Sequence, residues 1–194
     1  MTLELSLEQF QSINRKRTEG EEEELKKLRL MLKKFWQKVY PNLEYEFFLS
    51  GYSNIGYFEN IGFYVEVDAS SDDKIINTYG NDLEGAFVSI IKAVLLEYSM
   101  DYENKNRKEL QTNFETRFKG IKYAQGLYFA EYALEKWNQY YEDNIPDLII
   151  EHYENYLNTC FKRGDDMVWS YNREENKFVY KEKDKVKEMP GITS

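Results

Sequence analysis

The sequence of 194 residues contains one cysteine and one histidine, which restricts the chemistry open to it. Cys160 has no second cysteine with which to form an internal disulfide, and this favours a reducing compartment. Zinc sites draw on several Cys and His ligands, so two such side chains do not predict one. A Ser-His-Asp or Cys-His catalytic system would need His152 as its base. His152 lies beside Ile149 and Tyr153 on an expected helix face, so we interpret it as a packed or surface residue, and Cys160 as a small buried hydrophobic residue.

Three further features are missing from the chain. No run of about 18 apolar residues occurs, so no transmembrane helix is expected. The first nine residues lack the basic start and continuous apolar segment of a secretory signal peptide, and a cytoplasmic location is expected. A glycine-rich phosphate loop is absent as well. We therefore expect no cofactor, no membrane contact and no enzymatic activity.

Basic residues are also in the minority, since the formal net charge is −9. This argues against a nucleic-acid partner, because affinity for phosphates comes from Lys and Arg. The acidic excess is concentrated in residues 42–104, where 12 acids face only Lys74 and Lys92, for a net charge of −10. A surface of that charge attracts basic partners and speeds their encounter.

The N-terminal 41 residues carry two helix signals. Residues 6–9 form a capping-box pattern followed by apolar residues at helical spacing, which predicts a short first helix. Residues 18–21 form a second capping box. The helix that follows has an apolar stripe from Leu25 to Val39 and should end before Pro41.

Residues 42–80 have strand character. Residues 43–49 alternate in polarity, residues 55–58 and 62–67 flank a turn at 59–60 to make a hairpin, and residues 74–79 predict another short strand. Alternation in the hairpin predicts one buried face and one acidic face that bears tyrosines. Tyrosines beside acids are typical of protein interfaces, although a charged stretch can also be a solvated face. The predicted partner-binding residues are Tyr57, Glu59, Tyr64, Glu66, Asp68, Asp72 and Asp73.

Helical periodicity dominates residues 82–158. It predicts one helix over 83–104, a second over 107–141 that bends near Gly120 or Gly126, and a last helix that begins at Pro146. Residues 165–181 predict a closing hairpin, and residues 182–194 a charged tail. The sequence therefore predicts one α+β domain over residues 1–194, with a small antiparallel sheet packed against a bundle of long helices.

A group of polar residues lies where the first two of these helices meet. It comprises Tyr102, Glu103, Asn106, Arg107 and Arg117. Glu103 and Arg107 are four residues apart, so they can pair along one helix face. We interpret the group as a structural ionic cluster that locks two helices together; the alternative is a small active site built on Glu103, Arg107 and Arg117.

These residues also belong to a longer sequence pattern that resembles a known protein family. An apolar helix over 86–98 is followed by Tyr102-Glu103, Asn106-Arg107, Arg117, Gln125 and Trp137. Over about residues 80–150 this pattern resembles the Immunity protein 63 family of bacterial polymorphic toxin systems. The resemblance implies a non-enzymatic immunity protein that binds and neutralises a cognate toxin. It does not identify the toxin or the oligomeric state.

The expected function is therefore inhibition of a basic toxin through an acidic surface. A phage or mobile-element protein that binds a host factor through the same surface stays an alternative, as does the small enzyme described above.

Overall fold

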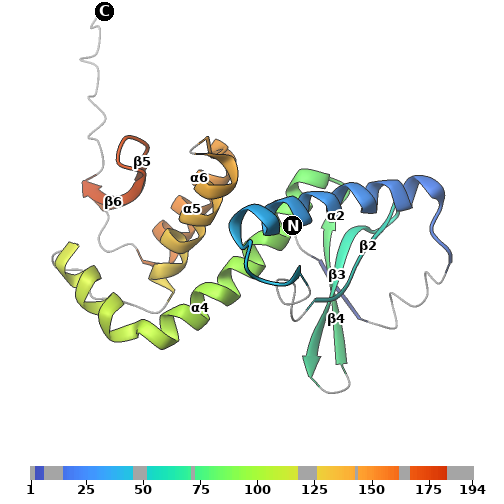
Figure 1. Cartoon of the computed structure of the whole chain (residues 1–194), viewed down its shortest axis with the longest axis horizontal. Coiled ribbons are helices and arrows are strands. Elements are labelled where there is room, and N and C mark those ends of the chain that lie inside the picture. The colour runs from blue at the N-terminus through green and yellow to red at the C-terminus, as the bar shows by residue number, and fades with distance from the viewer. Residues whose placement is uncertain are drawn as a thin grey trace, which may run out of the picture. The chain divides into compact units, whose positions relative to one another are not determined.

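The computed structural model describes residues 3–6, 15–45, 52–70, 73–117, 126–142, 144–161 and 167–182, with helices and a small antiparallel sheet in an α+β arrangement (Figure 1). This confirms the predicted fold class. Contacts between residues divide the chain into two compact units. Unit 1 consists of Met1–Tyr98 and Gln139–Glu142, and unit 2 of Ser99–Asn138 and Asp143–Ser194. The assignment of all 194 residues to one domain stays a prediction.

The sheet of unit 1 is antiparallel and has the strand order β1-β4-β3-β2. Its strands are β1 (Leu3–Ser6), β2 (Tyr52–Phe58), β3 (Gly62–Ser70) and β4 (Asp73–Gly80). The hairpin of β2 and β3 and the following strand β4 confirm the predictions for residues 55–67 and 74–79. Strand β1 differs from the prediction for this segment, because its last residue, Ser6, was expected to cap a helix. The rest of that predicted helix, and most of the predicted strand at 43–49, lie outside the described residues.

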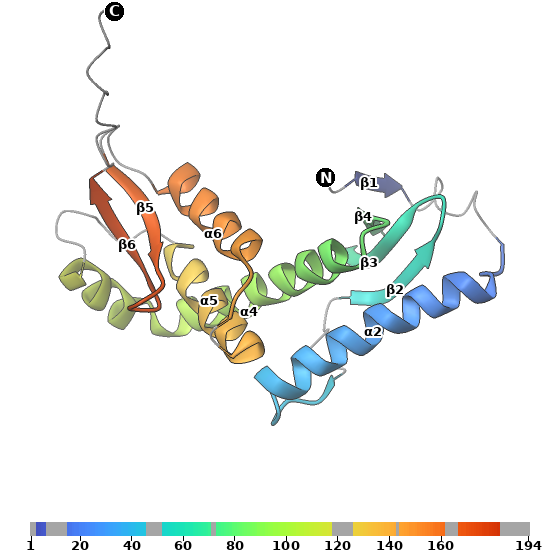
Figure 2. The same ribbon diagram turned by 90° about the horizontal axis from the view of Figure 1, so that it is seen from above.

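Helix α2 (Glu19–Val39) begins as the sequence predicts. The side chain of Thr18 accepts from Glu21 N at 3.3 Å, and Glu21 Oε2 accepts from Thr18 N at 2.8 Å, which completes a capping box. Its apolar stripe is fully buried at Leu25, Leu28, Leu32 and Phe35, and the helix ends two residues before Pro41. Figure 1 and Figure 2 both show α2 alongside strand β2, which it contacts.

Helix α4 (Leu83–Arg117) contains a kink at Asn106, whose backbone is not helical (φ −118°, ψ 18°). The kink confirms the predicted boundary between two helical segments near residues 104–107. The side-chain amide of Asn106 donates to Tyr102 O at 2.9 Å at this point, an alternative to the regular backbone pattern. Helix α5 (Leu127–Tyr141) begins directly after Gly126, which has φ +89°. The expected second helix over 107–141 is therefore interrupted at Gly126, and Gly120, the other glycine that favoured a bend, lies outside the described residues.

Unit 2 is completed by helix α6 (Asp147–Cys160) and a hairpin of strands β5 (Met167–Asn172) and β6 (Lys177–Glu182), seen in Figure 2. Asn158 of α6 joins the two by donating to Trp169 O and accepting from Trp169 N, both at 2.8 Å. In the core, the indole of Trp137 donates to the hydroxyl of Tyr153 at 3.1 Å, and both residues are fully buried. In the described part of the chain, no helix has the length and apolar character needed to cross a membrane.

Candidate functional site

The structure changes the interpretation of the predicted acidic face on the hairpin. Tyr57 and Tyr64 are only 8% and 1% exposed, so the prediction that tyrosines line a solvated face is wrong at both positions. The ring of Tyr64 lies over Gly56 on the neighbouring strand: a Cβ atom added to Gly56 would be 2.2 Å from the ring. Tyr64 also stacks on Phe58 with ring centroids 6.0 Å apart. This side of the hairpin is a second small core, which includes Ile76.

Arg17, from the segment before α2, contacts this second core. Its Nη2 donates to the Tyr64 hydroxyl at 2.6 Å and its Nε to Tyr57 O at 3.2 Å. Its guanidinium carbon is 5.1 Å from the centroid of the Phe58 ring, a cation–π distance. Burial raises the pKa of Tyr64, and the charge and hydrogen bond of Arg17 partly oppose that rise. Tyr64 is therefore a neutral structural residue rather than a recognition residue.

Glu21 links the start of α2 to the same hairpin. Its carboxylate is 3% exposed and accepts from Arg15 Nη1 at 2.6 Å and Nη2 at 2.5 Å, and from the backbone N–H of Glu59 at 2.9 Å. The hydrogen bonds from Arg15 are the main reason that the pKa of Glu21 lies well below its usual range. This buried acid is a structural feature that the capping pattern alone did not reveal.

The remaining predicted partner-binding acids are placed as follows. The Glu59 side chain is exposed, and Glu66 is half-buried and accepts from Asn54 Nδ2 at 2.9 Å. Asp68 and Asp73 belong to β3 and β4 by their backbone, and their side chains lie outside the described part of the structure. Asp72 lies outside the described residues altogether. The acidic surface thus loses its two tyrosines and keeps Glu59 and Glu66 as described members.

The predicted ionic cluster at the helix junction is also rearranged. Glu103 is 1% exposed, but both of its carboxylate oxygens accept from the backbone N–H of Gly126, at 3.2 and 3.0 Å. Arg107 is exposed and is not paired with Glu103 in the described structure, so the predicted Glu103–Arg107 lock is wrong. The side chain of Arg117 lies outside the described residues. Tyr102, 42% exposed, stacks on Tyr128 with centroids 5.2 Å apart. The alternative active site therefore does not assemble from these described groups.

Metal-ligating side chains do not gather elsewhere in the described structure. No group of three or more His, Cys, Asp or Glu side chains among the described residues is placed to hold a metal ion. His152 is half-buried and packs edge-on against Tyr153, as predicted for a packed histidine. Cys160 is exposed, so its interpretation as a buried hydrophobic residue is wrong. Cys160 is the last residue of α6.

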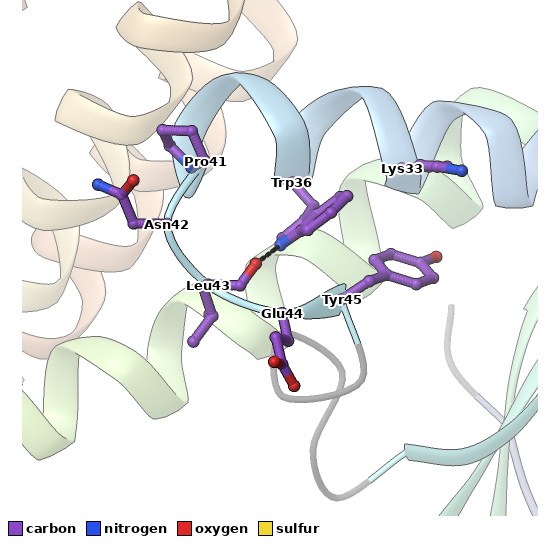
Figure 3. A pocket seen from close by; sticks show the side chains of 7 residues that line it. All are labelled: Lys33, Trp36, Pro41, Asn42, Leu43, Glu44 and Tyr45. Carbon is purple, nitrogen blue, oxygen red and sulfur yellow. Dashed lines mark hydrogen bonds between the residues drawn. The ribbon is translucent and has the colours of Figure 1, made fainter.

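A concave surface of unit 1 lies at the C-terminal end of α2 and has a volume of about 480 Å³. Figure 3 shows its lining, which comes from the last turns of α2 and the segment that follows: Lys33, Trp36, Pro41, Asn42, Leu43, Glu44 and Tyr45. We call this surface the Trp36 concavity. The rings of Trp36 and Tyr45 pack against each other at a tilt, with centroids 5.3 Å apart and planes at 58°. Both side chains are half-buried.

The position of the indole in the Trp36 concavity is held by the chain itself. Trp36 Nε1 donates to Leu43 O at 2.5 Å, which closes the turn after Pro41 back onto the helix (Figure 3). An indole N–H that is already satisfied leaves the ring face as the group available for recognition. The sequence signal for this site was present, since Trp36 lies off the apolar stripe of α2, but only the turn at Pro41 brings Tyr45 against it.

A second concave surface of unit 1, of about 570 Å³, is lined by Lys34, Gln37, Lys38, Tyr140 and Tyr141. Lys38 Nζ pairs with Glu142 Oε1 at 2.6 Å, and the Tyr140 ring packs on Phe35, 5.1 Å between centroids. Burial raises the pKa of Tyr141 to about 12. These residues are engaged in joining Gln139–Glu142 to α2, so we regard the Trp36 concavity as the better candidate for binding.

The arrangement of the Trp36 concavity suits binding rather than bond chemistry. It offers two aromatic faces, one amide, one carboxylate and one amine, with no hydrogen-bonded pair of nucleophile and base. Comparisons with known proteins add no identity: no family model, no curated protein and no solved structure matches this chain.

Proposed function

We propose that this chain is a non-enzymatic immunity protein that binds and neutralises a cognate bacterial toxin in the cytoplasm, and that the toxin presents a basic surface. The observation that carries the proposal is the Trp36 concavity, whose lining extends from the end of α2 into the start of the acidic stretch 42–104. Half-buried Trp and Tyr side chains are the residues that contribute most to protein interfaces. The net charge of −10 over residues 42–104 supplies long-range attraction for a basic protein.

The resemblance of residues 80–150 to the Immunity protein 63 family supports the same proposal. The acidic surface that we propose for toxin contact includes Glu59, Glu66, Asp68, Asp72 and Asp73, and the Trp36 concavity adds Glu44. Tyr57 and Tyr64 are excluded from it because they are buried.

The test uses the protein encoded by the neighbouring reading frame as the partner. The chain should co-purify with that protein, bind it with a measurable heat in calorimetry, and protect cells that express it. Charge reversal at Glu66, Asp68 and Asp72 together should weaken the complex. The affinity of this variant should also fall less steeply with salt concentration than that of the parent chain. A matched control reverses three exposed acids of unit 2, Glu109, Glu151 and Glu174, and should leave binding close to the parent value.

Two results would count against the proposal. Binding that is unchanged after reversal of Glu66, Asp68 and Asp72 would remove the acidic surface from the mechanism. A neighbouring frame that belongs to a phage structural operon, together with capture of a host protein, would favour the alternative of a mobile-element protein.

A further inference from the structure

We propose that side chains of α2 and of the segment before it close the outer edge of β2, and so prevent a second copy of this chain from adding a strand there. These side chains are Arg17, Glu21 and Arg29. The inference goes beyond the proposed function, because it concerns what keeps the free protein from associating with itself. It holds whichever partner the chain binds.

Strand β2 lies at one edge of the sheet, and its neighbour on the inner side is β3. The carbonyl of Phe58 accepts from Ile61 N at 3.0 Å within the turn that leads to β3, so this carbonyl points to the inner side. The backbone groups of successive strand residues point to alternate sides. The carbonyls of Ile55 and Tyr57 therefore point to the outer edge, where an added strand would bind.

Both of these outer carbonyls are bound by arginine side chains of the same chain. Arg29 Nη2 donates to Ile55 O, and Arg17 Nε donates to Tyr57 O, each at 3.2 Å. The Arg17 guanidinium is also held at its other end, where Nη2 donates to the Tyr64 hydroxyl at 2.6 Å. The arginines thus occupy the acceptors that the backbone N–H groups of an added strand would need.

A third contact extends this pattern past the end of β2. The backbone N–H of Glu59 donates to Glu21 Oε1 at 2.9 Å. Glu21 and Arg29 are eight residues apart in α2, which corresponds to a rise of about 12 Å along a helix. Their partners at positions 59 and 55 are four residues apart, or about 13 Å along a strand. Because these lengths match, α2 runs along the edge with its side chains opposite alternate strand residues, and Figure 2 shows α2 beside β2.

The charge of the two arginines adds to the closure. A guanidinium group has five N–H donors and no acceptor, so it cannot accept from the backbone of an added strand. A second copy that approached through the same edge would bring its own Arg17 and Arg29 against the first pair, and like charges repel. Charged side chains along an edge strand are a common means by which proteins avoid strand addition.

The experiment compares the self-association of the full chain with that of Arg29→Met and of the double variant Arg17→Met/Arg29→Met. Methionine is flexible and unbranched but cannot donate to a carbonyl. Sedimentation velocity over a wide range of protein concentration measures the association constant. Hydrogen exchange of the Ile55 and Tyr57 amides, followed by NMR, reports on the edge itself, because these N–H groups point the same way as their carbonyls.

We expect the association constant of the double variant to exceed that of the parent chain by about tenfold or more, with Arg29→Met between the two. In the double variant, the Ile55 and Tyr57 amides should exchange more slowly at high protein concentration than at low concentration. The double variant lacks two positive charges of an already acidic chain, so charge repulsion alone predicts weaker association.

Two controls separate edge closure from other effects. Lys26→Met/Lys27→Met removes the same charge from exposed positions of α2. Glu103→Ala removes a buried carboxylate of unit 2 and controls for reduced stability. Neither control should associate more strongly than the parent chain.

Three results would overturn the inference. They are arginine variants that associate no more strongly than the parent chain, association without slower exchange of the Ile55 and Tyr57 amides, and equal association in either control. Arg29→Met leaves Arg17 and its contacts in place, so this variant alone decides the outcome if the double variant does not fold.

Discussion

The carboxylate of Glu103 and the backbone N–H of Gly126 are hydrogen-bonded through both carboxylate oxygens, at 3.2 and 3.0 Å. The two residues are 23 positions apart, and Glu103 is 1% exposed. A buried carboxylate here satisfies a backbone donor at the start of α5, where the first N–H groups of a helix have no partner within it. Glu103 thus connects the kinked part of α4 to the beginning of α5.

Glu103 and Arg107 should differ in their contribution to stability. Glu103→Ala leaves the Gly126 N–H without its partner in a buried place and should lower the free energy of unfolding by about 1–3 kcal/mol. Arg107 is exposed, so Arg107→Ala should change it by less than about 0.5 kcal/mol. Urea denaturation followed by circular dichroism measures both values. A larger loss for Arg107→Ala than for Glu103→Ala would restore the ionic lock that the sequence predicted.

Gly126 should not tolerate a side chain. Its φ of +89° is unfavourable for other residues, and an added Cβ would lie 2.8 Å from the Tyr156 hydroxyl, which donates to Gly126 O at 3.0 Å. Gly126→Ala should therefore cost about 1–3 kcal/mol of unfolding free energy. Gly20→Ala is the matched control, because an added Cβ there meets nothing within 4 Å. It should leave the thermal midpoint unchanged or slightly raised; similar losses in both variants would contradict this account.

Gly56 and Tyr64 should be energetically coupled. An alanine at position 56 would place its Cβ 2.2 Å from the Tyr64 ring, so Gly56→Ala should displace that ring and cost about 1–3 kcal/mol. Tyr64→Ala removes the ring and its hydrogen bond with Arg17 and should be destabilising by about 3–5 kcal/mol. The double variant should be less destabilised than the two single losses together. Strict additivity in a double-mutant cycle would show that the contact between Gly56 and Tyr64 has no coupling energy.

Acidification should weaken unit 1 through Glu21. The hydrogen bonds from Arg15 depress the folded-state pKa of this carboxylate well below its usual range. A depressed carboxyl pKa contributes stability above the unfolded-state value, and that contribution is lost as the pH falls toward the folded-state value. The thermal midpoint should therefore decline below about pH 5, by roughly 2–4 °C for each kcal/mol lost. Glu21→Gln should flatten the decline, whereas Glu22→Gln, at an exposed acid one position further on, should not.

Several elements were predictable because their causes lie within a few residues. Thr18 and Glu21 specify the start of α2 through a local pair of hydrogen bonds, and the apolar stripe to Val39 specifies its buried face. The turn after Phe58 and the strand alternation specify the hairpin of β2 and β3 in the same way. Strand β1 could not be predicted so readily, since a four-residue strand depends on pairing with β4, about 70 residues away.

By itself, the sequence determined the α+β class, the start of α2, the hairpins, the position of the α4 kink and the concentration of acidic charge. Only the tertiary structure decided which of these residues reach solvent. Arg15 and Arg17 cover the tyrosine-bearing side of the hairpin, Glu103 binds Gly126 rather than Arg107, and the turn after Pro41 brings Tyr45 to Trp36. Periodicity and capping act over a few residues, whereas burial and the choice of hydrogen-bond partner depend on segments far apart in the chain.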